Sequence, residues 1–175
     1  MMFSSTTPAQ VVAPEATAPP ALNERIEHIT EIHAPIEKVW EALIDIDNWD
    51  WNKVFRLEAD KVAAGLKGTL KVASEGKNGV EWESFECTFG DMMDPESYTL
   101  HWTGSVGVTG CLFRGNHIMK LEVIKKIGCS SFTQLHHSED FDGILPHLNL
   151  GYDYEQVNKN YLLVNEALKD FVEKC

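Results

Sequence analysis

The last segment of the chain, Asp153 to Lys174, has the apolar spacing of one long helix. Its apolar side chains recur three or four residues apart, so they share one face of a helix about six turns long. They are Tyr154, Val157, Tyr161, Val164, Leu168 and Phe171. Such a helix gains most of its stability by packing its apolar face against another element. The segments before it must therefore supply that surface.

Those segments alternate as strands do, and none of them has the pattern of a second long helix. Arg25–His33 predicts a strand, Pro35 then suits the first turn of a helix that runs through Asp45, and Asp47–Asn52 predicts a second short helix. The strand candidates that follow are Val54–Ala59, Thr69–Ser74, Val80–Phe89, Tyr98–Gly104, Leu112–Lys125 and Ser131–Phe141.

This order of elements favours one architecture. Strands that follow each other with short connections form antiparallel sheets, whereas a parallel sheet needs strands and helices in alternation. The sequence therefore predicts an α+β helix-grip fold. In it a curved antiparallel sheet of six to seven strands wraps around the long C-terminal helix, with two short helices after the first strand. A helix laid across a curved sheet leaves a gap, where we expect a ligand cavity.

The N-terminal segment differs in composition from the rest. Met1 to Leu22 contains four prolines among small residues, and Glu15 is its one charged side chain. It has neither the basic start nor the apolar run of a secretory signal. We therefore predict a disordered Pro/Ala-rich tail over residues 1–22 and a single ligand-binding domain over residues 23–175.

Charge and cysteine usage bear on partners and location. The formal net charge of -12 at pH 7 disfavours binding to nucleic acid, and no apolar run approaches the ~20 residues of a membrane span. The four cysteines, Cys87, Cys111, Cys129 and Cys175, form no CxxC pair. We expect free thiols in a cytoplasmic protein with no nucleic-acid partner and no membrane span, either a monomer or a homodimer.

Several motifs are arranged as in one known group of proteins. Ile32–Asn52 reads IHAPIEKVWEALIDIDNWDWN, in which a strand ends in Ala-Pro and a helix carries Val-Trp. Further matching segments are Leu100–Trp102, Phe113–His117, His137–Gly143 and Asn165–Lys169. Over nearly everything except the tail, the chain resembles the SRPBCC superfamily, the START, birch-pollen-allergen and polyketide cyclase/dehydratase group. The resemblance implies a helix-grip fold with a deep hydrophobic pocket, and it fixes no reaction.

The last two predicted strands bring titratable side chains to the cavity wall. On the first of them, alternation places His117 on the more apolar, inward face, and on the second, His137 and Glu139 share a face. If the connecting turn is centred near Ile127 or Gly128, His117 lies opposite His137 or Glu139. Cross-strand neighbours are about 5 Å apart at Cβ. We therefore predict a catalytic cluster of His117, His137 and Glu139.

Three roles are open to this cluster. A histidine beside a carboxylate in an apolar pocket is an acid/base pair that can move a proton near neutral pH. The same residue types can hold a metal, although three ligands inferred from strand register are a weak basis for so stringent a site. The side chains can also simply satisfy one another or hold a ligand's polar end. We predict no metal and no cofactor.

Apolar residues on the inward faces are the candidates for the cavity wall. Aromatic side chains in strands usually belong to a core, and in a cavity protein they also bind rings by contact area. The predicted ligand-binding residues are Phe85, Phe89, Tyr98, Leu100, Trp102, Phe113, Met119, Leu135, Phe141 and Tyr161. The glycine-rich stretch Gly104–Gly110 suits a mobile lip at the pocket mouth. The apolar stretch Gly143–Tyr152 suits either a lid or a packed connector.

These observations together predict binding of a hydrophobic small molecule of polyketide, terpenoid or lipid type. The cluster around His117 adds a hypothesis of cofactor-independent cyclisation, dehydration or isomerisation by acid/base chemistry. One alternative is a non-catalytic carrier or sensor. Another, weaker, is a protein-interaction module like the chaperone activators of the superfamily, which would expose a contiguous apolar patch and lack a closed pocket.

Overall fold

A computed structural model describes residues 25–76, 79–107, 110–125, 132–148, 150 and 153–174 of the chain. Its seven strands form one antiparallel sheet in the order β1-β7-β6-β5-β4-β3-β2. The strands are β1 (Ile26–Ile32), β2 (Phe55–Glu58), β3 (Lys67–Gly76), β4 (Gly79–Phe89), β5 (Thr99–Val106), β6 (Phe113–Ile124) and β7 (Phe132–Asp142). The helices are α1 (Ile36–Ile44), the 3₁₀ helix η1 (Ile46–Trp51), α2 (Ile144–His147) and α3 (Tyr154–Lys174). The predicted α+β helix-grip fold is confirmed.

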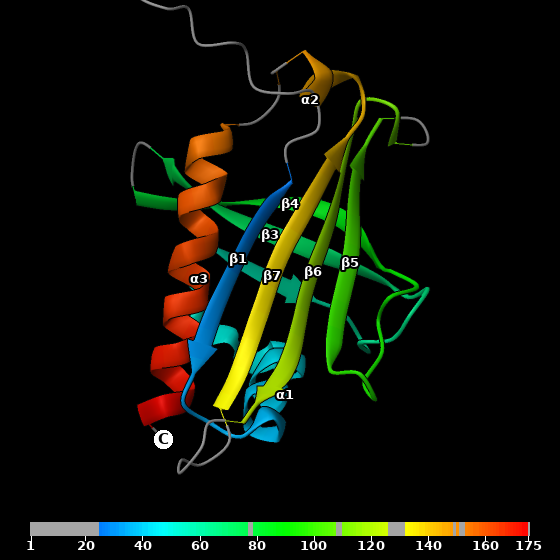
Figure 1. Cartoon of the computed structure of the whole chain (residues 1–175). Coiled ribbons are helices and arrows are strands. Elements are labelled where there is room, and N and C mark those ends of the chain that lie inside the picture. The colour runs from blue at the N-terminus through cyan, green and yellow to red at the C-terminus, as the bar shows by residue number, and fades with distance from the viewer. Residues whose placement is uncertain are drawn as a thin grey trace, which may run out of the picture.

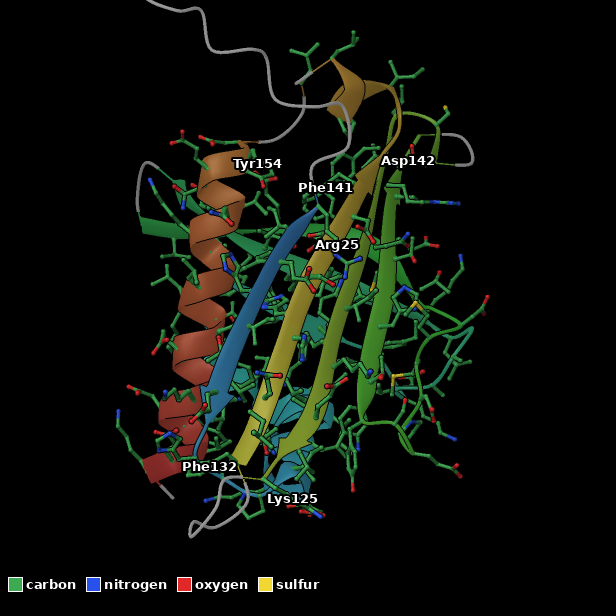
Figure 2. The ribbon with its side chains drawn as sticks, in the orientation of Figure 1. Arg25, Lys125, Phe132, Phe141, Asp142 and Tyr154 are labelled. Atoms are coloured by element: carbon green, nitrogen blue, oxygen red, sulfur yellow. The ribbon has the colours of Figure 1, made fainter. Side chains whose placement is uncertain are left out.

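The sheet curls around one long helix. Figure 1 shows β1, β7, β6 and β5 side by side, β3 and β4 crossing behind them, and α3 running alongside β1. Helix α1 lies at one end of this sheet and α2 at the other. Figure 2 marks these two ends by labelled residues: Phe132 and Lys125 lie at the α1 end, whereas Phe141 and Tyr154 lie at the α2 end.

The sheet opens between β4 and β5. Their ladder contains three pairs, which run from Cys87 opposite Gly104 to Phe89 opposite Trp102. Beyond Cys87, β4 continues in its long hairpin with β3, while β5 continues along β6 as far as Val106. The hairpin and β5 therefore diverge, and the space between them lies over the first half of α3.

The α1 end of the molecule holds the main core. The apolar residues of α1 share one face because of their spacing, and this face is buried; Val39 and Leu43 on it are fully buried. The second half of α3 packs Val164 and Leu168 against this layer. Tyr161, one turn earlier on α3, belongs instead to a smaller cluster at the α2 end. The long helix therefore closes a dense core with its second half and leaves its first half for another use.

Two predicted loops contain regular structure. Gly104 to Val106 belongs to β5, because pairing with β6 satisfies the backbone of this glycine-rich segment. The predicted lip therefore begins only after Val106, and residues 108 and 109 lie outside the described residues. The stretch Gly143–Tyr152 contains α2, which is tied to the β6 side by the backbone bond from the Leu145 N–H to the Leu112 carbonyl, 2.9 Å long.

Some predictions need correction or lie outside the described residues. On α3 the buried stripe ends at Val172, because the 3.6-residue period drifts past Phe171, which is 40% exposed. The tail over residues 1–22 and the turn near Ile127 and Gly128 lie outside the described residues. None of the described helices is long and apolar enough to cross a membrane.

Candidate ligand pocket

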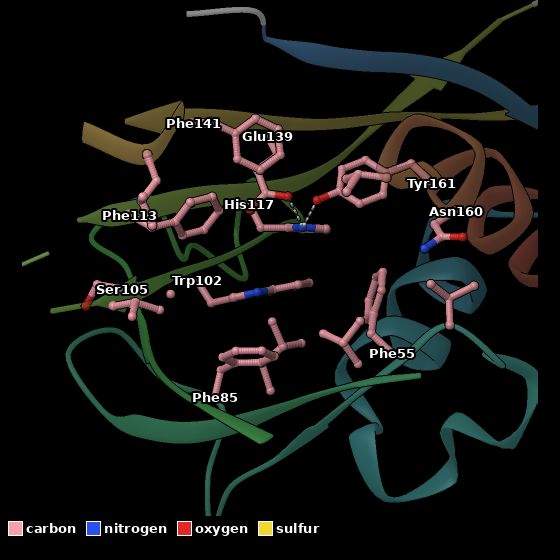
Figure 3. Close-up of a pocket in the computed structure, with 18 residues that line it drawn as sticks. Phe55, Phe85, Trp102, Ser105, Phe113, His117, Glu139, Phe141, Asn160 and Tyr161 are labelled. Atoms are coloured by element: carbon pink, nitrogen blue, oxygen red, sulfur yellow. Dashed lines mark hydrogen bonds and ion pairs between the residues drawn. The ribbon is translucent and has the colours of Figure 1, made fainter. Parts of the chain in front are cut away.

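A cavity of about 350 Å³ lies where the β3–β4 hairpin diverges from β5. Its wall is formed by this hairpin, by Phe55 on β2, by parts of β5, β6 and β7, by Leu145 on α2 and by the first two turns of α3 (Figure 3). Of the predicted ligand-binding residues, the following line it: Phe85, Trp102, Phe113, Phe141 and Tyr161. The volume falls in the range of about 300–1,000 Å³ that is usual for small-molecule sites.

The other predicted ligand-binding residues lie outside the wall. Four of them are fully buried in the main core: Phe89, Leu100, Met119 and Leu135. They share an inward face with the lining residues, but they sit at the α1 end, where α1 and the second half of α3 fill the space. Tyr98 packs its ring edge-on against Trp40, with centroids 5.9 Å apart. Strand alternation predicts which face of the sheet a residue lies on, but it does not predict whether that part of the strand borders the cavity or the core.

One part of the wall is polar, and it contains two members of the predicted catalytic cluster. His117 on β6 is directly opposite Glu139 on β7, and both line the cavity. The His117 Nδ1 atom is 3.1 Å from the Tyr161 hydroxyl and 3.6 Å from a Glu139 carboxylate oxygen. Figure 3 shows both side chains directed at this nitrogen. Side chains from β7 and α3 thus both approach His117 Nδ1 at the cavity wall.

The third member, His137, lies behind the wall. It is paired with Met119 and fully buried. Its Nε2 atom is 2.7 Å from the Nε2 atom of His117. Its Nδ1 atom is 2.6 Å from the Oδ1 atom of Asn165, whose amide in turn donates to the Thr30 hydroxyl at 3.0 Å. A continuous chain of hydrogen bonds therefore runs from the cavity to β1.

The geometry of the histidine pair does not suit a metal. Nitrogen ligands bind zinc at about 2.0–2.1 Å, so two of them on one tetrahedral ion lie well over 3 Å apart. The facing nitrogens of His117 and His137 are 2.7 Å apart, which is the distance of a hydrogen bond. Across the described residues, no group of three His, Cys, Asp or Glu side chains could hold a metal ion.

Two aromatic rings hold the imidazoles in place. Trp102 stacks on His117 with centroids 3.9 Å apart and planes 14° from parallel. Tyr161 stacks on His137 at 4.4 Å and 9°. His117 and His137 are only 3% and 0% exposed, so burial adds to the restraint that stacking places on both rings. The sheet and α3 therefore fix the orientation of both rings as well as their position.

Burial makes the acidic and basic groups of the site neutral near pH 7. Loss of solvation raises the pKa of Glu139 to about 8, and the nearby Asp140 carboxylate adds to the effect. Loss of solvation also lowers the pKa of His117 and of His137 well below 6.5, to which the proximity of His101 adds for His117 and that of His117 for His137. At neutral pH the cavity therefore offers a protonated carboxylic acid beside an unprotonated imidazole.

A glycine makes room for the acid. A Cβ atom at Gly115 would lie 2.2 Å from the Glu139 Oε1 atom. Gly115 is two residues before His117 on the same face of β6, and it lines the cavity. Any larger residue there would displace the carboxyl group. Gly115 is therefore part of the site, although it brings no functional group to it.

No protein-family model and no curated protein matches the sequence, whereas many solved structures match its fold. The structure is similar to Ara h 8.0201, at 15% identity and a TM-score of 0.59 over 87% of this chain and 99% of that one. The chain shares the helix-grip fold with this neighbour. ZhuI aromatase/cyclase from Streptomyces sp. R1128 matches at 16% identity and a TM-score of 0.55, over 87% and 94% of the two chains. TTHA0849 from Thermus thermophilus matches at 13% identity and a TM-score of 0.55, over 86% of this chain and 98% of that one.

Two residues that shape the polar part of the site were not singled out from the sequence: Gly115, which lines the cavity, and Asn165, which lies behind its wall. Asn165 is fully buried on the apolar face of α3, where a polar side chain needs a partner. That mismatch between position and polarity is a signal that sequence reading can find. Gly115 carries a weaker signal, since a glycine inside a strand often marks a close approach of another group.

Proposed function

We propose that the chain binds a neutral, apolar, ring-containing molecule in this cavity and moves a proton on it with His117 as base and Glu139 as acid. The observation that carries the proposal is the juxtaposition of His117 Nδ1 and the Glu139 carboxyl, 3.6 Å apart, in the wall of an aromatic cavity. An acid and a base this close can act on the two ends of one carbonyl–enol system.

The charge of the wall supports a neutral ligand. No lysine or arginine is among the described residues that line the cavity, and burial keeps Glu139 protonated near pH 7. A carboxylate or phosphate inside would lose its solvation without gaining a cationic partner, which is costly. Flat aromatic surfaces such as Trp102, Phe85 and Phe113 favour rings, which they bind by area and by stacking.

The proton transfer follows from the positions of the three polar groups. The Tyr161 hydroxyl can turn its hydrogen from His117 to a ligand oxygen, which leaves the Nδ1 lone pair free. His117 then takes a proton from the carbon next to a carbonyl, and Glu139 gives its proton to the carbonyl oxygen. The C–H bond breaks, an N–H bond forms, and the ligand becomes an enol. Return of the proton to another carbon of a conjugated enol isomerises the ligand, whereas return to the same carbon, after the proton on His117 has been replaced from solvent, exchanges the hydrogen.

The solved neighbours are consistent with this proposal at the level of the fold. One of them is an aromatase/cyclase by name, whose fold matches at 16% identity. At that identity the similarity does not transfer residues or substrate. Support for acid/base chemistry therefore comes from His117 and Glu139 themselves.

Binding is tested with paired probes. We expect 2-naphthol to bind by isothermal titration calorimetry, and 2-naphthoate to bind at least about 100-fold more weakly, because its charge would be buried without a cation. The His117→Ala variant should bind 2-naphthol more weakly. Its matched control is His136→Ala, on the outward face of the same strand as Glu139. Equal binding of the two probes would contradict a neutral site.

Catalysis is tested by hydrogen exchange into 2-tetralone in D₂O at pH 7, followed by NMR. We expect the protein to accelerate exchange next to the carbonyl, and His117→Ala to return the rate to that of buffer. His136→Ala should exchange as fast as the wild type. A wild-type rate equal to buffer, with 2-naphthol still bound, would reject the acid/base proposal and leave a carrier.

The carrier alternative has one observation in its favour. The polar groups of the wall already satisfy one another, since His117 contacts Tyr161, Glu139 and His137. A site of this kind is stable without performing a reaction. The two assays separate the readings, because a carrier binds 2-naphthol and does not exchange 2-tetralone. The interaction-module alternative predicts an exposed apolar patch in place of a pocket, so the cavity of about 350 Å³ gives it less support.

A further inference from the structure

The geometry points to His137 and Asn165 as positioning residues that set which nitrogen of His117 carries the proton, so that the nitrogen facing the cavity is a hydrogen-bond acceptor. This inference rests on the proposed function for its purpose, but the tautomer is a property of the protein without ligand. Neither residue lines the cavity, and both are fully buried. Their effect therefore reaches a ligand only through His117.

The direction of the hydrogen bonds starts at the amide of Asn165. Its Nδ2 atom donates to the Thr30 hydroxyl at 3.0 Å, so its Oδ1 atom is the one that faces His137, at 2.6 Å. A carbonyl oxygen only accepts hydrogen bonds. The His137 Nδ1 atom must therefore carry the hydrogen. Because burial keeps this imidazole neutral, its Nε2 atom has none.

The same reasoning applies to the next ring. The bare Nε2 atom of His137 faces the Nε2 atom of His117 at 2.7 Å, and one of two facing nitrogens must donate. His117 therefore carries its hydrogen on Nε2. Its Nδ1 atom, toward the cavity wall, is left with a lone pair. The Tyr161 hydroxyl, 3.1 Å away, donates to that lone pair.

Stacking and burial oppose rotation of the two imidazole rings. Trp102 and Tyr161 stack on the two imidazoles, and His117 and His137 are buried. The protonated Glu139 matches the same polarity, since a neutral carboxyl group can donate to a bare nitrogen. If the Asn165 amide were turned over, the direction of all these hydrogen bonds would be reversed, and His117 would carry its hydrogen on Nδ1. That nitrogen could then no longer act as a base.

The direct test uses the wild-type protein without ligand. Long-range ¹H–¹⁵N NMR distinguishes bare from protonated imidazole nitrogens. We expect a bare Nδ1 and a protonated Nε2 in His117, and the opposite pattern in His137. The opposite pattern in both rings overturns the inference. Equal populations of the two tautomers overturn it too, because the chain then sets nothing. The result does not depend on a variant that folds or on a ligand that binds.

A second test uses a substitution that should reverse the direction of these hydrogen bonds. Asn165→Asp places a carboxylate against His137 Nδ1, which favours a charged imidazole with hydrogens on both nitrogens. His137 then donates to His117, and the hydrogen of His117 moves to Nδ1. We expect this change in the NMR pattern of His117 and an affinity for 2-naphthol about tenfold lower. The matched control is Val164→Ala, a buried change one residue away on α3, which should leave the tautomer unchanged.

The outcomes separate this inference from the proposed function. If wild-type protein shows the expected tautomers but binds no 2-naphthol, the proposed function fails and the inference stands. If 2-naphthol binds but Asn165→Asp leaves both the tautomer and the affinity unchanged, the positioning role is wrong. The affinity for 2-methoxynaphthalene, which has no hydrogen to donate, should not fall in Asn165→Asp. A loss of affinity for both probes, with an unchanged NMR pattern of His117, would overturn the positioning role.

Discussion

The ionisation of Glu139 should make the stability of the protein depend on pH in a way that one substitution removes. Burial raises the pKa of this carboxyl from its ordinary value of 4.5 to about 8, and its side chain is 14% exposed. Each pKa unit corresponds to about 1.4 kcal/mol. Carrying Glu139 as an anion therefore costs the folded state about 5 kcal/mol relative to the unfolded chain.

The sign follows from where the protons are. Below pH 4.5 the acid is protonated in both states, and the folded state bears no cost. Between pH 4.5 and about 8 the unfolded chain loses this proton while the folded protein keeps it, so stability falls as the pH rises. Above about pH 8 the loss is complete. About 2 kcal/mol of the loss falls between pH 6.5 and 9 by the same relation.

The assay compares wild type with Glu139→Gln by urea unfolding at pH 6.5 and at pH 9. The lowered pKa values of His117 and His137 affect stability mainly below pH 6.5. The buried Cys87 thiol, whose pKa is raised to about 11, contributes equally to both proteins and cancels in the comparison. We expect the free energy of unfolding of the wild type to fall by about 2 kcal/mol more than that of the variant. The matched control is Glu122→Gln on the outward face of β6, which should keep the wild-type pH dependence. Parallel pH profiles of wild type and Glu139→Gln would refute the buried, protonated acid.

Three further substitutions test the site and the core. Gly115→Ala should push the Glu139 carboxyl away from His117, since the new Cβ would meet it, and slow 2-tetralone exchange by about 100-fold while 2-naphthol still binds; an unchanged rate would remove the acid from the mechanism. Tyr161→Phe should lower the free energy of unfolding by about 1 kcal/mol, because His117 Nδ1 loses its hydrogen-bond donor; an unchanged urea midpoint would contradict this. Leu168→Ala, at a fully buried position of α3, should cost about 2–5 kcal/mol in urea unfolding; a loss under 1 kcal/mol would mean that α3 does not close the core.

The fold could be predicted because its signals are local. The period of α3 and the alternation of the strands depend on neighbouring residues, and the order of elements leaves few topologies. The cross-strand pairing of His117 with Glu139 was one of two registers that the sequence allowed. Alternation also placed His117 and Glu139 on the inward face. These features need no knowledge of distant contacts.

The limits of the pocket could not be predicted in the same way. Leu100 and Trp102 share a face and are two residues apart, yet only Trp102 reaches the cavity. The difference depends on how far α1 covers the sheet and on the point where β4 stops pairing with β5. Both depend on the packing of segments that are distant in the sequence. His137 likewise lies on the same face of β7 as Glu139, but its position along the strand places it in the core. Its partner, Asn165, comes from a helix 28 positions away.

The measurement that tests the central claim most directly is native mass spectrometry of the protein isolated from its own source, followed by denaturing extraction of any bound compound. The account predicts one equivalent of a neutral, apolar, ring-containing molecule that carries a carbonyl or hydroxyl group. His117→Ala, isolated in parallel, should carry less of it than His136→Ala. A stoichiometric anionic lipid or phosphate ester, or a protein that carries nothing and takes up neither 2-naphthol nor 2-methoxynaphthalene, would contradict the account.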